Sequence, residues 1–377
     1  MKYISVCSGI EAATVAWHPL GWEPVAFAEI EPFPAAVLQH HWPHVPNLGD
    51  MTKIDGRQYR GDVDILVGGT PCQAFSIAGL RQGLSDARGN LTLTFVELAD
   101  AIQPSFILWE NVPGVLSSKD NAFGCLLAGL AGENEALLPS GKRWTDAGCV
   151  YGPTRTVAWR TLDAQYFGVA QRRRRVFVVA CARGRADPCK ILFEWEGQRR
   201  DAPPRRKDGE GQIACTPESI SGTVSSKWAK GSGGPSGDEH YNLIVEQAVF
   251  STVAPTVSSS GPPYSRPGNS RVETDAVIVC RMRQGKPGGG KGPRRAEGLS
   301  LTLATANDQV VFVDRPRKFM PVEGERLQGF PDDHTDIPWM GAAHAPDTLR
   351  WKAIGNSMCV NVMRWIGERI NNIENQE

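Results

Sequence analysis

The stretch Asp64-Ile65-Leu66-Val67-Gly68-Gly69-Thr70-Pro71-Cys72-Gln73 joins an apolar run to a rigid turn. Ile65 to Val67 is typical of a short buried strand. The two glycines allow the chain to turn, and Pro71 fixes its own φ and restricts the residue before it. Because open α/β sheets place their chemistry at the carboxyl ends of strands, the thiol of Cys72 is a candidate reactive group. The alternative is a buried structural cysteine, which is the commoner role for a single Cys.

The composition allows one large domain or two ordinary ones. The chain has 377 residues, is 41% hydrophobic and carries a formal net charge of +0, so overall charge does not indicate a partner. Its 9 cysteines are scattered without a CxxC pair, which argues against a zinc site. There is no signal-peptide pattern and no apolar run long enough to cross a membrane. These features predict a soluble, cytoplasmic protein with reduced thiols.

The first 50 residues resemble the start of a nucleotide-binding βαβ unit. A predicted strand at residues 2–6 leads into a turn containing Gly9, and a helix is expected over residues 12–20. A second strand at residues 25–28 ends at Glu29, which either binds ribose hydroxyls or is a charge at a helix N-terminus. Asp50 is either an ordinary turn residue or a group that binds the exocyclic amine of an adenine.

The middle of the chain places polar groups at the end of a further strand. Residues 74–90 are too long and polar for a tight turn and predict a lid beside the site. A helix is expected over residues 91–102 and a strand over residues 106–109, followed by Glu110 and Asn111. These two side chains are therefore expected on the same rim of the sheet as Cys72. Taken alone, Glu110 could equally be a solvated loop acid.

Four consecutive arginines, Arg172 to Arg175, precede a predicted strand at residues 176–179. Alternation along an extended segment would send Arg173 and Arg175 to one face and the other two to the opposite face. His40, His41 and His44 have a spacing that could suit a metal, but Pro43 interrupts any helix that would align them, so no metal site is predicted. A helix is expected over residues 117–130 and a flexible connection over residues 133–148.

Residues 184–316 differ in composition from the rest, being rich in Gly, Pro, Ser and Arg. Three imperfect β-hairpin-like units are predicted, with strand-like runs at residues 242–245, 276–279 and 310–313. Residues 281–320 hold nine basic and three acidic residues, which suits contact with a polyanion. The alternative is a disordered linker. Helices return at residues 321–329 and 360–371, the second with Val362, Ile366 and Ile370 on one face.

Taken together, these stretches resemble the DNA (cytosine-5) methyltransferase family of bacteria and phages. Five motifs occur in the family's order and cover most of the chain: Gly68 to Gln73 (the catalytic-cysteine motif), Glu110-Asn111-Val112 (ENV), Gln171 to Arg175 (QxRxR), Glu325 to Pro331 (RLQGFP) and Gly355-Asn356-Ser357 (GNS). The opening departs from the family pattern Asp-Leu-Phe-x-Gly-x-Gly-Gly, since it runs Ser5-Val6-Cys7-Ser8-Gly9-Ile10-Glu11-Ala12. Cys7 replaces the aromatic residue that would stack on the cofactor adenine.

The resemblance implies a Rossmann-like, S-adenosylmethionine-dependent methyltransferase domain of class α/β with a smaller, mostly β target-recognition domain. The catalytic domain would comprise residues 1–183 and 317–377, with residues 184–316 inserted for recognition. The implied partner is double-stranded DNA, modified for restriction-modification or a similar purpose, and the chain is expected to be a monomer. The implied cofactor-binding residues are Ser8, Gly9, Ile10, Glu29, Ile30, Asp50, Met51, Pro71, Leu91, Asn356 and Ser357.

The implied chemistry assigns a role to each catalytic residue. Cys72 would add to C6 of cytosine and activate C5 for attack on the donor methyl group. Glu110 would share a proton with N3, Arg173 would hold the O2 edge, and Arg175 would orient the pair. Asn111 completes the predicted catalytic set. Because C6 cannot be reached inside a duplex, the base must flip out. The predicted DNA contacts are Gln73, Ser76, Arg81, Arg88, Gln171, Arg294 and Arg295.

Three other functions fit parts of the sequence. A tRNA cytosine-5 methyltransferase would share the fold, but the long basic β insertion favours duplex DNA. A DNA-binding regulatory relative without activity would normally have a broken motif, whereas Cys72, Glu110, Arg173 and Asn356 are all present. A thiol hydrolase would need a histidine near Cys72, and none of the 7 histidines lies in a convincing motif.

Overall fold

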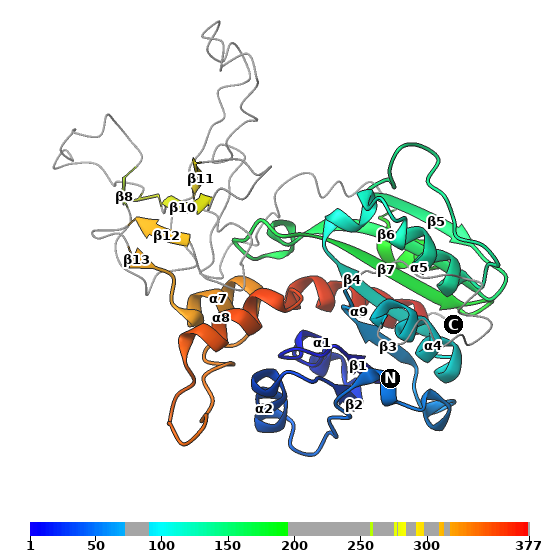
Figure 1. The fold of residues 1–377 in the computed structure, drawn as a ribbon, viewed down its shortest axis with the longest axis horizontal. Coiled ribbons are helices and arrows are strands. Elements are labelled where there is room, and N and C mark those ends of the chain that lie inside the picture. Colours follow the sequence, from blue (N-terminus) through cyan, green and yellow to red (C-terminus); the bar gives the residue numbers. More distant parts are fainter. Residues whose placement is uncertain are drawn as a thin grey trace, which may run out of the picture.

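The centre of the molecule is a seven-stranded sheet in the order β2-β1-β3-β4-β7-β6-β5 (Figure 1). The computed structural model describes residues 1–71, 90–194 and 317–375 and the strand segments 257–258, 275–276, 278–283, 292–297 and 309–312. The strands of the large sheet are β1 (Lys2–Val6), β2 (Glu23–Ala28), β3 (Ile65–Gly68), β4 (Phe106–Asn111), β5 (Ala147–Tyr151), β6 (Arg155–Asp163) and β7 (Arg174–Ala182). With helices on both faces, this sheet confirms the predicted α/β class.

The strand directions bring distant motifs to one edge. The strands β2, β1, β3 and β4 are mutually parallel, so their carboxyl ends share a rim. The strand β7 is antiparallel to β4, with Glu110 opposite Phe177 and Asn111 opposite Val176. The start of β7, rather than its end, therefore lies at this rim, and the arginine run is brought next to the end of β4.

Strand alternation divides the apolar side chains between two cores. Tyr3, Val67 and Leu108 pack on one face, and Ile4, Leu66 and Trp109 pack on the other. The helices are α1 (Ala12–Trp17), α2 (Pro32–His41), α4 (Leu91–Ile102), α5 (Ala122–Ala131), α6 (Pro188–Leu192), α7 (Pro321–Gln328), α8 (Asp347–Asn356) and α9 (Val360–Glu374). The first core contains residues of α1, α6, α7, α8 and α9, whereas the second contains residues of α4 and α5.

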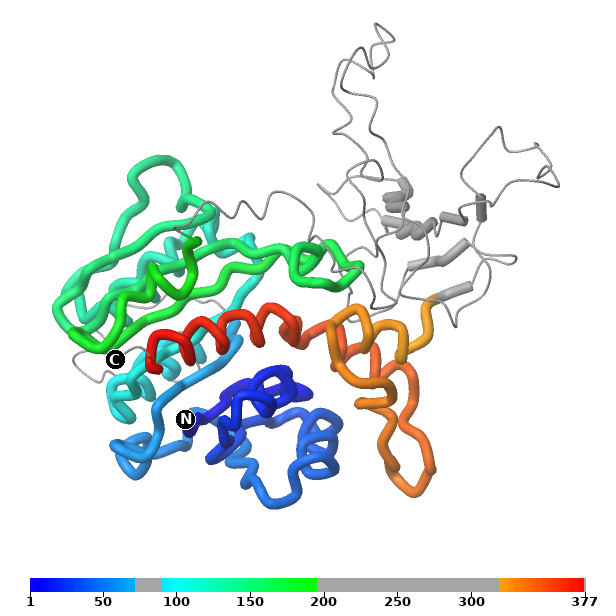
Figure 2. The backbone as a smooth tube through the Cα atoms, turned by 180° about the vertical axis from the view of Figure 1, so that it is seen from behind, coloured from blue at the N-terminus to red at the C-terminus, as the bar shows by residue number. Residues whose placement is uncertain are grey.

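The two ends of the described chain pack side by side. Figure 2 shows α9, in red, running along α1, in blue. The indole Nε1 of Trp17 donates a hydrogen bond to the carbonyl of Met363 at 2.9 Å. The predicted apolar face of the last helix is confirmed, since Val362, Ile366 and Ile370 are all buried. Residues more than 340 positions apart in sequence thus share one core.

A smaller antiparallel sheet lies beyond α7 in Figure 1. It has the order β11-β10-β12-β13, from β10 (Ile278–Arg283), β11 (Gly292–Glu297), β12 (Gln309–Phe312) and β13 (Arg317–Lys318). A separate pair consists of β8 (Val257–Ser258) and β9 (Asp275–Ala276). Two of the predicted strand runs, 276–279 and 310–313, overlap β10 and β12, and the run at 242–245 lies outside the described residues.

Several predicted boundaries move. The predicted strand at 106–109 continues through Glu110 and Asn111, because both residues pair with β7. The helix predicted over 117–130 begins at Ala122, after a 3-10 turn at Pro113–Ser117. The helix α6 falls in the segment assigned to the recognition domain, yet Ile191 and Leu192 belong to the core of the large sheet. No helix among the described residues is long and apolar enough to cross a membrane.

Candidate active site at the carboxyl ends of the strands

The turn that leads to Cys72 is held by three hydrogen bonds. Asn111 Nδ2 donates to the carbonyl of Thr70 at 2.7 Å, and the indole of Trp109 donates to the Thr70 hydroxyl at 2.9 Å. The hydroxyl of Thr92, in the first turn of α4, donates to the carbonyl of Pro71 at 2.6 Å. Strand β4 and helix α4 therefore fix the position from which the next residue leaves the sheet. Asn111 is thus a positioning residue rather than a catalytic one.

Part of the predicted site lies outside the described residues. Cys72 comes directly after Pro71, the last described residue of this turn. The described chain resumes at Asn90, and the helix α4 begins at Leu91. The other predicted residues of this segment are Gln73, Ser76, Arg81 and Arg88.

Glu110 is a buried carboxylate at the rim. It is 9% exposed, and Arg175 Nε lies 3.1 Å from its Oε1. A Cβ built on Gly69 would lie 3.5 Å from Glu110 Oε2, so the carboxylate is next to the turn that carries Cys72. Burial raises the pKa of Glu110, and the charges of Arg175 and Arg173 oppose that rise. A carboxyl group with a raised pKa beside a candidate nucleophile can hold a proton for a bound base.

Arg173 joins the rim to the C-terminal part of the chain. Its side chain is 2% exposed, and its Nη2 donates to the carbonyl of Ser357 at 2.6 Å and to that of Gly355 at 3.3 Å. Burial, followed by the charge of Arg175, lowers the pKa of Arg173 to about 10, so it remains a cation at neutral pH. Within the described residues its Nε and Nη1 have no hydrogen-bond partner. Two donors next to Glu110 are therefore available to a ligand.

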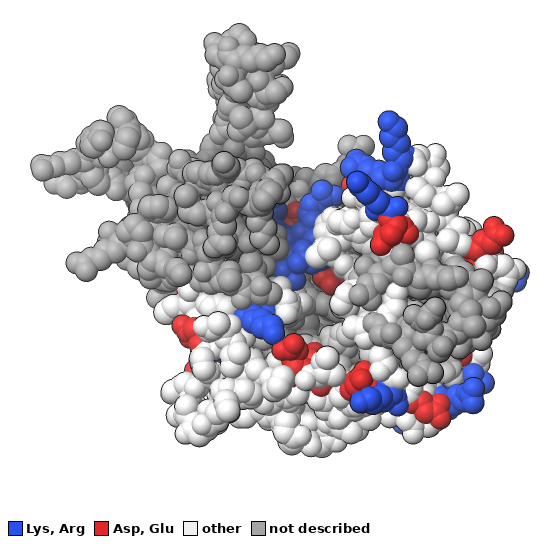
Figure 3. Space-filling view, in the orientation of Figure 1, with Lys and Arg blue, Asp and Glu red and all other residues white. Residues whose placement is uncertain are grey.

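The predicted alternation of the arginine run is confirmed. Arg173 is buried and Arg175 is partly buried, whereas Arg172 and Arg174 are exposed. Figure 3 shows basic side chains gathered near the centre and top of this face, with most acidic side chains nearer its lower and right-hand edges. Arg173 and Arg175 thus lie on the Glu110 side of the strand, whereas Arg172 and Arg174 contribute to the surface charge.

Glu29 and Gly9 join the ends of β2 and β1. Glu29 Oε2 accepts a hydrogen bond from the Gly9 backbone at 2.8 Å, and its Oε1 accepts one from the Glu31 backbone at 2.7 Å. Gly9 has a φ of +58°, and a Cβ there would meet nothing within 4 Å. The backbone over Gly9 is therefore open to the close approach of a ligand. Ile30, which follows Glu29 in the sequence, is 70% exposed. This exposure is unusual for an isoleucine and suits a flat apolar contact with a ligand.

Four residues predicted to contact the cofactor also have structural partners within the protein. The side chain of Ile10 is fully buried in the first core, and Met51 is 3% exposed and pairs with the thiol of Cys7 at 3.6 Å. The Ser8 hydroxyl donates to the Ser5 carbonyl. Asp50 Oδ1 accepts hydrogen bonds from the backbone and hydroxyl of Thr52, which lower its pKa, so it forms the turn considered as the alternative.

The remaining predicted contacts surround the rim. Asn356 is exposed and Ser357 is buried, and both line a hollow at the carboxyl ends of β1 and β3. Pro71 is exposed and Leu91, the first residue of α4, is partly buried. The prediction that Gln171 contacts DNA is wrong for this structure, since Gln171 is 0% exposed and its Nε2 donates to the carbonyl of Leu327. Arg294 and Arg295 lie on β11, opposite Arg281 and Cys280 of β10.

Glu11 lines the same hollow, although the sequence pattern predicted no role for it. Its carboxylate is buried, with the residue 1% exposed, and its backbone has a φ of +63°. Met358 also lines the hollow and contacts the space over Gly69. The available signal was the departure from the family pattern, because Glu11 stands where that pattern has a glycine.

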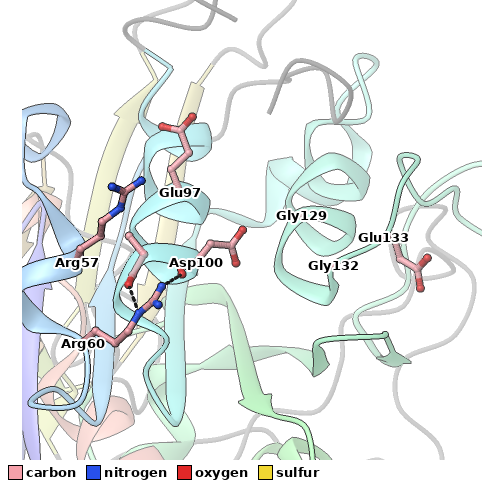
Figure 4. A pocket seen from close by; sticks show the side chains of 8 residues that line it. Arg57, Arg60, Glu97, Asp100, Gly129, Gly132 and Glu133 are labelled. Atoms are coloured by element: carbon pink, nitrogen blue, oxygen red, sulfur yellow. Dashed lines mark hydrogen bonds between the residues drawn. The ribbon is translucent and has the colours of Figure 1, made fainter. Parts of the chain in front are cut away.

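A larger cavity, of about 350 Å³, lies at the opposite edge of the sheet (Figure 4). It is lined by Arg57, Arg60, Glu97, Asp100, Ala101, Gly129, Gly132 and Glu133. Arg60 donates hydrogen bonds to the carbonyls of Ala101 and Asp100 across its wall. Because it is at the amino ends of β3 and β4, this cavity is remote from the turn at Pro71 and is not the active site. Within the described residues, no cluster of side chains could hold a metal ion.

Comparisons with known proteins agree with this geometry. A sequence model of the family described as C-5 cytosine-specific DNA methylase matches residues 1–372. A type II methyltransferase, M2.BsuMI of Bacillus subtilis, is 26% identical over 377 residues, covering 98% of this chain and 75% of its own length. M.SsoII of Shigella sonnei is 26% identical over 371 residues, covering 98% and 79%.

A more similar relative carries a different name. The "DNA N-6-adenine-methyltransferase" of Escherichia phage P1 is 44% identical over 460 residues, which cover 98% of this chain. The chain spans only 61% of that relative's length. Among solved structures, the S. pombe Dnmt2 methyltransferase has a TM-score of 0.53 at 15% identity, covering 100% of this chain and 99% of its own. The Entamoeba histolytica methyltransferase EhMeth has a TM-score of 0.53 at 12% identity, with the same coverage. At these identities the structures show the shared fold.

Proposed function

Because the chain belongs to the C-5 cytosine-specific DNA methylase family, we propose that it transfers a methyl group from S-adenosylmethionine to C5 of cytosine in double-stranded DNA. The observation that carries this proposal is the group formed by Glu110, Arg175 and Arg173 beside the Pro71 turn. A buried carboxyl group whose pKa is raised by burial, together with two cations, suits the polar edge of a cytosine ring. Pro71, the residue before Cys72 in the sequence, lies on the same rim.

The rim carries polar and apolar groups that suit S-adenosylmethionine. Glu29 presents a carboxylate at the end of β2, the backbone of Gly9 is open, and Ile30 offers an exposed apolar surface. A buried carboxylate oxygen of Glu11 without a hydrogen-bond partner suits a cationic ligand. When bound, the donor supplies an electrophilic methyl group. We assign Glu29 and Ile30 to the adenosine end, and Asn356 and Ser357 to the opposite wall of the hollow.

The chain's own residues activate the acceptor. C5 of cytosine is a poor nucleophile, and addition of the Cys72 thiolate to C6 makes the ring an enamine that can react at C5. Glu110 donates a proton to N3 as negative charge develops on the ring, and Arg173 binds the O2 edge through its free donors. Arg175 holds the Glu110 carboxylate at 3.1 Å. Once C5 carries the methyl group, its proton leaves to water and the bond between Cys72 and C6 breaks.

Replacement of the nucleophile tests the proposal. Cys72→Ala and Cys72→Ser should each abolish methyl transfer while DNA binding survives, because only the covalent step needs the thiol. DNA and RNA substrates are incubated with labelled S-adenosylmethionine, digested to nucleosides and analysed by mass spectrometry. The wild-type protein should yield 5-methylcytosine in DNA.

The control is Cys149→Ser, which changes a free cysteine of β5 away from the rim and should retain activity. DNA containing 5-fluorocytosine gives a second readout, because the fluorine cannot leave as a proton does. The wild-type protein should become covalently attached to such DNA and the Cys72 variants should not. Full activity in either Cys72 variant would overturn the assignment.

A second candidate function is N6 methylation of adenine, which the name of the phage P1 relative suggests. The matching family is described as cytosine-specific, and this chain matches only part of that relative. An exocyclic amine carries its own nitrogen nucleophile and needs no thiol addition to the ring. The group at Glu110 therefore favours cytosine. The same nucleoside analysis separates the two functions, since N6-methyladenine and 5-methylcytosine differ in mass and retention.

A further inference from the structure

Glu11 has features that the stability of the fold alone does not explain. It follows β1 in the hollow at the rim and begins α1. Its Oε1 accepts hydrogen bonds from the backbone and hydroxyl of Thr14, at 3.1 and 3.2 Å. Its Oε2 is buried and has no hydrogen-bond partner among the described residues. A buried acceptor without a partner is costly and rare in native proteins, which suggests that a ligand provides the donor.

The strand order places Glu11 between the two ends of the proposed reaction. Along the rim, β2 brings Glu29, β1 brings Gly9, β3 brings Gly69 and β4 brings Glu110. If the adenosine end lies at Glu29 and the cytosine at Glu110, the amino-acid portion of the donor occupies the hollow over β1 and β3. The lining of that hollow includes Ser5, Gly9, Glu11, Gly69, Glu110 and Asn356.

We propose that the buried carboxylate of Glu11 binds the α-ammonium group of S-adenosylmethionine. This inference rests on the proposed function and adds a residue to it. An ammonium group has three N–H donors and a positive charge, so it satisfies both the open acceptor and the negative charge of Glu11. The sulfonium centre carries no N–H or O–H donor and cannot form that hydrogen bond. It must also face the base at β4 for its methyl group to be transferred.

The surrounding groups agree with a cationic ligand. Burial raises the pKa of Glu11 to about 7, and the negative charge of Glu29 adds to that rise. The hydroxyls of Ser5 and Thr14 and the Thr14 backbone lower it. With like charge nearby and little water, a cation gains more at this position than it would at the surface.

A thermodynamic cycle between protein and ligand tests the proposal. Dissociation constants are measured by calorimetry for wild type and Glu11→Gln with two ligands: S-adenosylhomocysteine, and its deamino analogue S-adenosyl-4-thiobutyrate. Glutamine keeps the acceptor for Thr14 but removes the charge. The wild type should prefer S-adenosylhomocysteine by about 10- to 100-fold, the range for a charge-assisted hydrogen bond. Glu11→Gln should lose most of that preference.

Other outcomes overturn the proposal. Equal weakening of both ligands by Glu11→Gln would mean that Glu11 only shapes the hollow. An unchanged preference would mean that another group binds the ammonium. The ligand preference of the wild-type protein tests the proposal by itself, so the test does not depend on a stable Glu11→Gln variant. If the wild-type protein showed no preference for S-adenosylhomocysteine, the proposal would be refuted. Glu29→Gln is the matched control, which should weaken both ligands alike, since it acts at the adenosine end.

Failure of the proposed function gives a different result. If the wild-type protein binds neither compound, the donor assignment itself is wrong. S-Adenosylmethionine provides the last comparison, because it has both charges whereas S-adenosylhomocysteine has only the ammonium. Glu11→Gln should weaken both by similar factors. A loss seen with S-adenosylmethionine alone would identify the sulfonium as the bound group and would refute the proposal.

Discussion

Glu11 combines two unfavourable features at one position. Its φ of 63° lies in the left-handed region, which costs a residue with a side chain roughly 1–2 kcal/mol. Its carboxylate is fully buried, and the groups that donate to it or lower its pKa are uncharged groups of Ser5 and Thr14. Tyr3 completes a short chain of hydrogen bonds, since its hydroxyl lies 2.7 Å from that of Thr14. Such local strain is characteristic of ligand-binding sites, where binding compensates for it.

The pH dependence of folding should report this carboxylate. Burial raises the pKa of Glu11 from 4.5 to about 7, and Glu29 adds to the rise. Between these values the folded protein holds a proton that the unfolded chain releases. The stability that Glu11 contributes is therefore complete below about pH 4.5 and is lost as pH rises through about 7, a change on the order of 3 kcal/mol. Glutamine does not titrate.

Urea unfolding of the ligand-free protein measures this effect. We expect Glu11→Gln to gain stability relative to wild type as the pH is raised from about 5 to about 8, by the amount given above. Tyr3, whose pKa Glu11 also helps to raise, titrates above this window and does not interfere. Glu23→Gln, at the exposed start of β2, is the control and should follow the wild-type curve. Parallel curves for wild type and Glu11→Gln would contradict the prediction.

At the scale of elements, the packing of α9 against α1 fixes the position of a helix that begins at the rim. Gly367 of α9 faces Trp17 of α1, and a Cβ on Gly367 would lie 2.5 Å from the Trp17 Nε1. That nitrogen already donates to the carbonyl of Met363. Because α1 begins at Glu11, a displaced α1 would also move the wall of the hollow. The packing of α1 on α9 is therefore coupled to the shape of the hollow through a single short helix.

Gly367→Ala should destabilise the fold although alanine favours helices. Alanine gains roughly 1 kcal/mol of helix propensity, but a contact this short forces Trp17 to move, which typically costs about 1–3 kcal/mol. We expect a lower urea midpoint and weaker binding of S-adenosylhomocysteine. Glu368→Ala changes the next, exposed residue of α9 and should not lower stability. A stabilised Gly367→Ala variant would show that α1 and α9 adapt without cost.

The elements were more predictable than the contacts of their side chains. Buried strands such as Ile65–Gly68 and the helix Leu91–Ile102 follow from local apolar patterns. The burial of Gln171 does not, because its partner, the Leu327 carbonyl, is 156 residues away. The hydrogen bonds from Thr52 to Oδ1 of Asp50 likewise could not be read from the sequence pattern. A motif identifies the residues of a site, but tertiary packing decides which of them face the ligand.

For the molecule as a whole, the sequence predicted the separation of a catalytic sheet from a basic β region. The family resemblance implied that Arg175 orients the catalytic groups, and the ion pair of Arg175 with Glu110 fits that role, whereas the pairing of β4 with β7 was not predicted. The burial of the Glu11 carboxylate was not predicted, because the sequence pattern indicates only a turn at that position. The packing of α6 on β6 and β7, beyond the predicted boundary at residue 184, was not foreseen either, because its apolar residues do not differ in composition from those of a linker.

The basic β region gives a prediction for the whole complex. Arg294 and Arg295 lie on β11, next to β10 in the small sheet, and the segment around them carries an excess of positive charge. If both contact DNA phosphates, replacing them with glutamine should weaken binding across sequences. It should also reduce the slope of log K against log salt by about 2, since each lost phosphate contact removes about 0.9. Titration of a duplex at several salt concentrations measures both effects.

A matched pair of arginines provides the control for this measurement. Arg57 and Arg60 lie on the cavity at the opposite edge of the large sheet, remote from the rim (Figure 4). Replacing both with glutamine removes the same net charge, so any effect of overall charge alone appears in this variant too. We expect the control to keep the wild-type slope. Equal slopes in both double variants would mean that Arg294 and Arg295 make no phosphate contact.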